Sequence, residues 1–210
     1  MRPGGYRGGR GAPPAILRPP AVRLTPRELF VLFAIGAVGG LVGDAGHVQA
    51  GTTTYLDDAT PFVWESALWF PVLVGLATAS VGELRLRLGP PRPGFDLRTG
   101  LAAIAAVLAI YAVTALVYDE PEGPASVLVM MLAVLVACWL GGGMPELVCG
   151  VAAAIVGPLA EILIVELDLA EYSPEADTLG GVALWLPALY FAFGFVAARL
   201  AELLVARRAG

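Results

Sequence analysis

Six long apolar runs constrain this chain more than any other feature of its sequence. A helix needs about 20 apolar residues to cross a hydrocarbon core of about 30 Å, and each run approaches or reaches that length. The runs extend from about Glu28 to Gly46, Phe62 to Gly82, Leu101 to Tyr118, Ala125 to Leu140, Leu147 to Leu167 and Val182 to Ala198. The sequence therefore predicts an all-α integral membrane protein, a bundle of six transmembrane helices.

The composition argues against a soluble domain. Hydrophobic residues make up 58% of the chain and charged residues 15%, whereas soluble proteins have roughly 45–50% apolar and about 25% charged residues. Because the charges gather in short clusters instead of recurring at every helical turn, lipid is expected to cover most of the surface.

The arginines predict the orientation in the membrane. All 13 lysine-plus-arginine positions are arginine, and they occupy the first 27 residues, the segment between the second and third runs, and the carboxyl end. An even number of spans places these three regions on one face, and the positive-inside rule makes that face cytoplasmic. The opposite loops carry acidic residues without a basic one: Asp57, Asp58, Asp119, Glu120, Glu122, Glu171, Glu175 and Asp177.

We divide the chain into three parts. Residues 1–27 are rich in Gly, Pro and Arg and are expected to form a disordered cytoplasmic tail. Residues 28–205 form the six-helix transmembrane domain, and residues 206–210 a short cytoplasmic tail. Thr25, Pro26 and Glu28 supply an N-cap, a first-turn proline and an early carboxylate, which suit a helix start. A cleaved signal peptide is the alternative for this end, although the tail is long for its basic region.

No motif of an enzyme or a metal site is evident. The sequence offers no phosphate-binding loop, no Ser-His-Asp set on one side and no paired His-Glu motif of a membrane protease. His47 is the only histidine and lies three residues after Asp44, whereas a zinc site needs three or four ligands. Cys138 and Cys149 flank a turn on the reducing face, which disfavours a disulfide. We predict no catalytic residue, cofactor, metal or nucleic-acid partner.

Glu161 is the ionisable residue placed deepest in a predicted span. It follows Gly157-Pro158, a pair that can kink the helix and free a backbone carbonyl. Ionisable groups at membrane depth are costly and mark functional sites such as proton relays or partners of a ligand hydroxyl. The structural alternative is a protonated glutamate that hydrogen-bonds a neighbouring helix.

The tryptophans offer a second set of candidates. Trp64, Trp69, Trp139 and Trp185 lie towards predicted helix ends, where they either form an interfacial belt or line a lipid cavity. Pro71 and Pro187 follow two of them in a repeated Trp-x-Pro pattern inside the second and sixth runs. Both prolines are expected to bend their helices and open space between them.

Two blocks of the sequence resemble the Insig family of sterol sensors. The first runs from Gln49 to Gly82, with matches at Gln49, Thr53, Asp57, Ser66-Ala67, Trp69, Pro71, Gly75, Ala77, Val81 and Gly82. The second comprises Tyr172-Ser173-Pro174-Glu175 and Trp185-Leu186-Pro187, with Phe191 and Gly194. The resemblance implies six transmembrane helices with both ends cytosolic, an oxysterol bound within the membrane, and the escort protein Scap as a partner.

Two positions depart from the family pattern. The acidic residue associated with Scap binding falls at Gly141-Gly142-Gly143, and the glutamine associated with sterol binding falls near Ala125-Ser126. These departures argue against a Scap-type partner and against oxysterol specificity. The arginine-only, Gly/Ala-rich composition also suggests a bacterium with GC-rich DNA and therefore its inner membrane.

The hypothesis is an Insig-like bacterial lipid sensor that binds an apolar lipid, sterol-like or diacylglycerol-like, in an intramembrane cavity. Its predicted lipid-binding residues are Trp64, Trp69, Phe70, Pro71, Trp139, Glu161 and Trp185. Glu161 leaves a proton-coupled transporter as an alternative, and the small-residue face of Gly36, Gly39, Gly40 and Gly43 leaves a scaffold for a membrane partner or a homo-oligomer.

Overall fold

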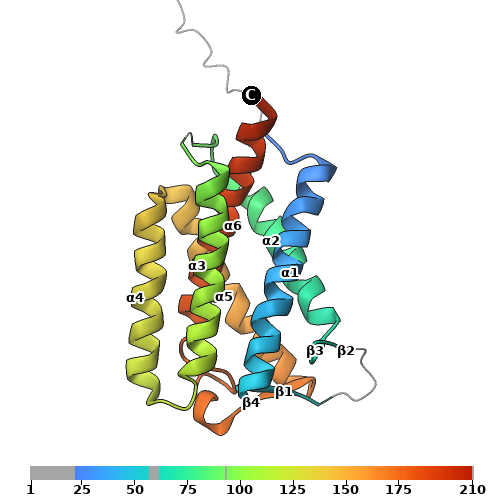
Figure 1. Ribbon diagram of the computed structural model, residues 1–210, viewed down its shortest axis with the longest axis vertical. Helices are drawn as coiled ribbons and strands as arrows, with labels where there is room; N and C mark the ends of the chain where they lie inside the picture. The colour runs from blue at the N-terminus through green and yellow to red at the C-terminus, as the bar shows by residue number, and fades with distance from the viewer. Residues whose placement is uncertain (1–21, 57–61, 93, 210) are drawn as a thin grey trace, which may run out of the picture.

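Six helices form a single bundle in the computed structural model, which describes residues 22–56, 62–92 and 94–209 (Figure 1). They are α1 (Pro26–Ala50), α2 (Trp69–Arg87), α3 (Leu97–Leu116), α4 (Glu122–Leu140), α5 (Met144–Glu166) and α6 (Leu186–Ala209). Five of the described helices are long and apolar enough to cross a membrane; α2, which carries Glu83, Arg85 and Arg87 near its end, is the sixth. The predicted six-helix membrane bundle is confirmed.

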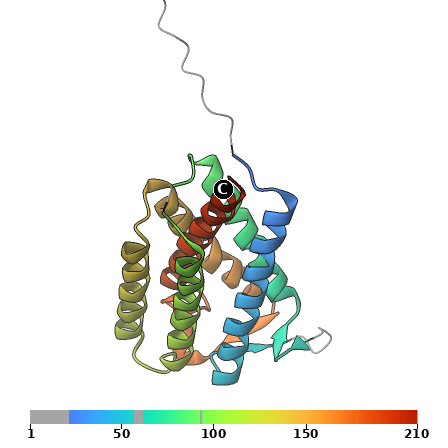
Figure 2. The ribbon, with the colours of Figure 1, turned by 45° about the horizontal axis from the view of Figure 1, so that its top comes forward.

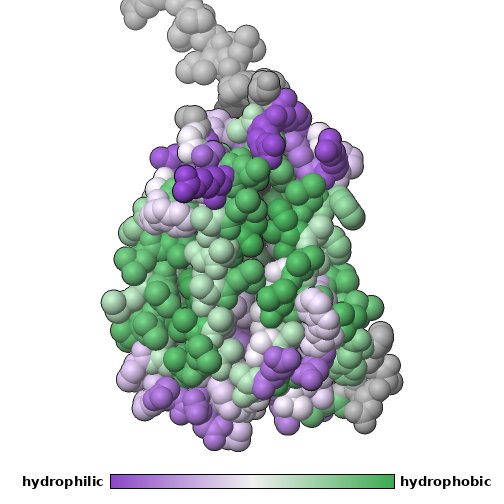
Figure 3. Space-filling view, viewed as in Figure 1, coloured by the Kyte–Doolittle hydropathy of each residue, from purple (hydrophilic) through white to green (hydrophobic). Residues whose placement is uncertain are grey.

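The surface is divided into bands. On the face drawn in Figure 3, hydrophobic residues cover most of the middle of the bundle, and hydrophilic residues gather at both ends. Large apolar side chains are exposed along α4 and α5, including Met131, Leu135, Val156 and Leu163. Since such exposure is stable in hydrocarbon and not in water, this is the surface of a multi-pass membrane protein.

Helix α6 is the centre of the bundle. In its membrane-spanning segment 78% of the residues are buried, compared with 22–33% in the other four apolar helices. Helix α6 also contacts all five other helices. In Figures 1 and 2 its red ribbon lies among the remaining helices. Any cavity inside the bundle is therefore walled on one side by α6.

The start of α1 and the end of α6 lie at the same end of the bundle, here called the arginine end. The Arg208 guanidinium pairs with the Glu28 carboxylate at 2.9 Å and also donates to the backbone carbonyl of Arg23. The predicted helix start is confirmed, because Thr25 caps α1 in a capping box with Glu28. Residues 1–21 of the predicted tail lie outside the described residues.

Short strands close the opposite end, here called the outer end. Strand β1 (Thr53–Tyr55) pairs antiparallel with β4 (Ala170–Tyr172), and Thr53 lies opposite Tyr172. Strands β2 (Phe62–Val63) and β3 (Ser66–Ala67) form a hairpin, and a 3-10 turn, η1 (Pro174–Ala176), follows β4. Hydropathy alone gave no sign of these elements.

The predicted start of the second span is wrong. Residues Phe62 to Leu68 are not helical, because Trp64 and Glu65 both adopt positive φ angles (50° and 68°) and reverse the chain. Two consecutive residues with positive φ define the tight turn that joins antiparallel strands. Helix α2 accordingly begins at Trp69.

The predicted proline bends in the second and sixth helices are also wrong. Pro71 is the third residue of α2 and Pro187 the second residue of α6. A proline in the first turn costs no intrahelical hydrogen bond, so it starts a helix without bending it. The Trp-x-Pro pattern thus marks two helix starts at the outer end. Pro158, by contrast, does lie inside α5.

Glycine allows α1 and α2 to pack closely. A Cβ added to Gly36 would lie 2.0 Å from the Thr78 hydroxyl and 3.0 Å from the Val74 carbonyl oxygen, and one added to Gly40 would lie 2.8 Å from Val74 Cβ. The small-residue face predicted as a docking surface is therefore used, at least at these two positions, inside the chain itself.

We expect Gly36→Ala to destabilise the fold by about 1–3 kcal/mol, because the methyl group forces α1 and α2 apart. Gly46→Ala is the matched control in the same helix, since its added Cβ meets nothing within 4 Å. That variant should be neutral or slightly more stable. Melting temperatures in detergent compare the two, and equal values would contradict the proposed close packing.

Candidate functional site: an apolar cavity with a polar end

An apolar cavity, here called the α2–α5 cavity, lies between α2, α5 and α6. It encloses about 260 Å³ and its walls are almost entirely apolar, with Phe70, Ala77, Ala153, Ala160 and Phe193 among its lining residues. Helices α2 and α5 contact each other less closely than either contacts α6. The exposed lining residues Leu73 and Val156 place the opening towards the surrounding lipid.

A second, narrower cavity of about 50 Å³ lies between α1, α2, α3 and α6 and is here called the α1–α3 cavity. Its lining is also apolar and includes Gly36, Gly40 and Ile104. Val74 and Phe193 line both cavities. The two apolar spaces are therefore adjacent and separated by these two side chains.

A small polar pocket of about 20 Å³ lies at the outer end. Its lining combines ionisable and hydroxyl-bearing residues from three helices and two strands: Asp44, His47, Thr53, Tyr55, Tyr111, Glu161 and Tyr172. It shares Phe70 with the α2–α5 cavity and Tyr111 with the α1–α3 cavity. The polar pocket is therefore adjacent to both apolar cavities, and Phe70 and Tyr111 lie between it and them.

Each carboxyl group of the pocket accepts a hydrogen bond from a tyrosine. The Tyr55 hydroxyl donates to Asp44 Oδ2 at 2.6 Å, and the Tyr190 hydroxyl donates to Glu161 Oε1 at 2.6 Å. Burial, together with the adjacent Asp44 charge, raises the pKa of Tyr55 well above its ordinary value. Its phenol therefore stays protonated and remains a donor.

His47 is fixed by a hydrogen-bond chain. Its Nε2 lies 2.9 Å from Thr114 Oγ, and the Thr114 hydroxyl donates its hydrogen to the Tyr111 carbonyl at 2.7 Å. Because that hydroxyl hydrogen is already used, Thr114 accepts from His47, which assigns the proton to Nε2. Trp185 packs on the imidazole with ring centroids 5.5 Å apart.

Some of the predicted lipid-binding residues line or adjoin the three spaces, and others do not. Phe70 and Glu161 line the cavities, Trp69 stacks edge-on against Tyr55 and Phe70, and Pro71 is buried in the same turn of α2. Trp185 is buried beside the pocket. Trp64 (67% exposed) and Trp139 (54% exposed) do not line any of the three spaces.

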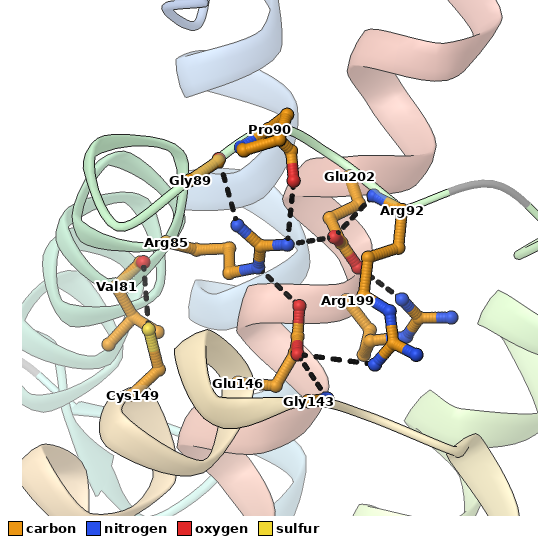
Figure 4. A network of polar contacts seen from close by, with 10 residues as sticks. All are labelled: Val81, Arg85, Gly89, Pro90, Arg92, Gly143, Glu146, Cys149, Arg199 and Glu202. Carbon is orange, nitrogen blue, oxygen red and sulfur yellow. Dashed lines mark hydrogen bonds and ion pairs between the residues drawn. The ribbon is translucent and has the colours of Figure 1, made fainter.

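A buried ion network occupies the arginine end (Figure 4). The Arg85 guanidinium lies between two carboxylates, donating to Glu146 Oε1 at 2.5 Å and to Glu202. Arg199 also pairs with Glu202, whose Oε1 accepts the backbone N–H of Arg92 at 2.8 Å. Arg85, Glu146 and Glu202 are fully buried, so this network ties α2, α5, α6 and the α2–α3 loop together.

Comparisons with known proteins agree with this architecture. No family model matches the chain. The chain is 52% identical over 187 residues to an INSIG protein homolog of Mycolicibacterium vanbaalenii, and the match covers 89% of this chain and 91% of that protein. The crystal structure of a mycobacterial Insig homolog, MvINS from Mycobacterium vanbaalenii, superposes with a TM-score of 0.86 over 89% of this chain and 98% of that one, at 52% identity. A cross-linked MvINS trimer gives a TM-score of 0.86 with the same coverage at 51% identity.

Proposed function

This chain belongs to the Insig family, and we propose that it binds one membrane lipid in its intramembrane cavities and acts as a lipid sensor. The observation that carries the proposal is that two apolar cavities lie next to one polar pocket and share lining residues with it. A lipid has the same division into apolar chain and polar head. Binding sites for such ligands are mostly apolar with a few placed polar groups.

The shape of the site favours a lipid with two chains over a rigid sterol. Val74 and Phe193 separate the two apolar cavities, so a branched ligand can place one chain on each side of them. A sterol is a single rigid body and fills one cavity. Between the sterol-like and diacylglycerol-like ligands, we therefore prefer the latter.

We expect the purified protein to retain lipid and Ala160→Phe to reduce that retention by about tenfold, which equals about 1.4 kcal/mol. Ala160 lines the α2–α5 cavity, and a phenylalanine there fills it. Lipid extraction and mass spectrometry of the protein purified in detergent measure the bound lipid.

The control for this experiment is Ile155→Phe on the same helix. Ile155 is exposed to lipid and does not line the cavity, so the same ring should leave retention unchanged. If the original protein contains no enriched lipid and retains neither radiolabelled diacylglycerol nor radiolabelled sterol, the proposed function is wrong.

The proposal includes an orientation in a bacterial inner membrane, with both termini cytoplasmic. Supporting it, the hydrogen bond of Arg208 to the Arg23 carbonyl and the contact of Arg92 with Glu202 on α6 bring arginines from all three basic regions to one end of the bundle. Self-association is also part of the proposal, on the model of the related cross-linked trimer.

Cysteine labelling tests the orientation. In a background with Cys138 and Cys149 replaced, Glu120→Cys should react with a membrane-impermeant maleimide in intact cells with a permeable outer envelope. Arg87→Cys should react only after the inner membrane is opened. Both positions are exposed, and they belong to opposite ends of the bundle. Labelling of both from the same side would contradict the orientation.

A further inference from the structure

The ion network at the arginine end contains more positive than negative side chains. Its ion pairs join Arg85 to Glu146 and Glu202, Arg199 to Glu202, and Arg92 to Glu146 at 3.8 Å. Three guanidinium groups therefore meet two carboxylates. A charge that is held away from water without a counter-charge costs free energy. The network thus lacks one negative charge.

Arg199 is the member of the network with an unused hydrogen-bond donor. Its side chain is only 5% exposed, and its Nη1 donates to Glu202. Among the described residues its Nε–H has no acceptor, although that nitrogen is shielded from water. Buried donors are almost always hydrogen-bonded. The Nε–H edge of a guanidinium group is one of the two edges that bind a pair of phosphate or carboxylate oxygens. Arg199 thus points to an anion with several oxygens.

The loop between α2 and α3 determines how such an anion can approach. The Arg199 guanidinium lies over the Phe95 ring, 4.6 Å from the ring centroid, so the ring covers one of its faces. An anion must therefore approach in the plane of the guanidinium, where the N–H donors point. Arg92 is the most exposed member of the network, at 45%. Figure 4 shows Arg92 and Arg199 on the same side of the two carboxylates, opposite Arg85. The route to Arg199 therefore passes Arg92.

The position of the network in the membrane favours a phosphate group as the anion. Arg85 directly follows Leu84, which lines the apolar α2–α5 cavity, and hydrophilic residues gather at this end of the bundle (Figure 3). Lipid phosphates lie at the same boundary between hydrocarbon and water, and basic side chains there attract anionic lipids. A phosphodiester carries one negative charge, which matches the one that the network lacks.

We propose that Arg92 and Arg199 form a binding site for one phosphate group, supplied by the head group of an anionic phospholipid. Arg199 binds two phosphate oxygens through its Nε–H edge, and Arg92 binds a third from the exposed side. Neither arginine lines the two apolar cavities or the polar pocket, so the inference is independent of the lipid proposed there. Because Arg92 belongs to the α2–α3 loop and Arg199 to α6, the phosphate also links the loop to the central helix.

The experiment offers the full-length chain, in detergent, equal concentrations of dioleoyl phosphatidylglycerol and dioleoyl phosphatidylcholine. Unbound lipid is washed away, and the bound lipids are extracted and quantified by mass spectrometry. We expect an excess of phosphatidylglycerol of at least about tenfold. Dioleoylglycerol measured in the same extracts tests the proposed function separately.

A second arm distinguishes a lipid phosphate from free phosphate. Inorganic phosphate is titrated in place of the lipids, and the melting temperature of the protein is followed. A rise in melting temperature together with equal retention of the two lipids assigns the site to free phosphate and overturns the lipid source. Equal retention without such a rise overturns the site itself.

Arg92→Gln and its control Arg98→Gln separate a built site from general attraction to a basic surface. Each variant removes one exposed arginine at the same end, and Arg98 lies outside the network. Arg92→Gln should lower the excess of phosphatidylglycerol by about five- to tenfold, while Arg98→Gln should leave it unchanged. Equal losses in the two variants would show that the lipid responds only to the total charge, and the site would be wrong.

Arg199→Lys tests the guanidinium edge. Lysine keeps the positive charge for Glu202 but has no planar pair of donors. The excess of phosphatidylglycerol should fall by about fivefold, whereas Arg207→Lys, an exposed change on the same helix, should have no effect. An unchanged excess in Arg199→Lys would overturn the two-arginine site. The comparison of Arg92→Gln with Arg98→Gln changes exposed side chains only, so it decides the question if Arg199→Lys fails to fold.

Discussion

Replacing Arg85 with methionine is expected to cost about 3–5 kcal/mol of folding free energy, because it removes the buried cation that bridges two buried carboxylates. Glu202 then keeps only Arg199, and Glu146 keeps only the partly exposed Arg92 at 3.8 Å. Arg85 contacts both Glu146 and Glu202, and all three side chains are shielded from solvent. Methionine keeps an unbranched, flexible side chain in place of the aliphatic part of arginine, so the loss reports mainly the guanidinium group and its contacts. Thermal and denaturant unfolding in detergent micelles measure it.

Arg87→Met is the matched control, two residues further along the same helix. Its side chain is 72% exposed and lies 3.9 Å from Glu83, and exposed pairs of this kind contribute about 0–1 kcal/mol. The double variant Arg85→Met and Glu146→Gln should recover part of the lost stability, because Glu146 then carries no charge and Glu202 keeps Arg199 as its partner. Equal stability of Arg85→Met and Arg87→Met would show that the network does not hold the helices together.

The sequence could not predict this network. By its position Arg85 is one of the arginines between the second and third apolar runs, and the sequence indicates only that these arginines face the cytoplasm. The partners of Arg85 are 61 and 117 positions away in the chain. A single sequence contains no spacing rule for contacts of that separation, whereas charge bias and hydropathy are local properties that can be read directly.

Hydropathy predicted the first, third, fourth and fifth spans to within about four residues. The sixth was predicted to end at Ala198, whereas α6 continues to Ala209, because its last turns carry charged residues and therefore lower the hydropathy. The segment from Phe62 to Ala67 was included in the second span but forms the β2–β3 hairpin. Hydropathy reports that a segment avoids water and says nothing of φ angles. Hydropathy therefore could not predict the positive φ values of Trp64 and Glu65.

The candidate site was predicted only in part, for a similar reason. Glu161 was found because a carboxyl group inside an apolar run is conspicuous, and Phe70 because it adjoins Trp69. Tyr55 and Tyr172 were missed, since the pairing of β1 with β4 brings together strands more than 100 residues apart. Tyrosine is also common at membrane interfaces, so its presence alone gives no signal.

Trp185→Ala is the second variant with a large expected effect, a loss of about 3–5 kcal/mol in folding free energy. Trp185 is 1% exposed and packs between His47 and the core at the start of α6. Truncation leaves a cavity beneath the central helix, and the neighbours cannot close it without moving α6. Unfolding in detergent measures the loss.

Trp139→Ala and Trp64→Ala are the controls. The sequence analysis treats all four tryptophans as one set of candidates, whereas the structure buries Trp185 and exposes Trp64 and Trp139. Both side chains are more than half exposed, so their truncation should change the folding free energy by no more than about 0.5 kcal/mol. If all three variants lose equal stability, Trp185 is not the core residue assigned here. If Trp185→Ala alone is destabilised, Trp185 has two roles at the outer end. It packs against His47 beside the polar pocket, and it holds the start of α6 in place.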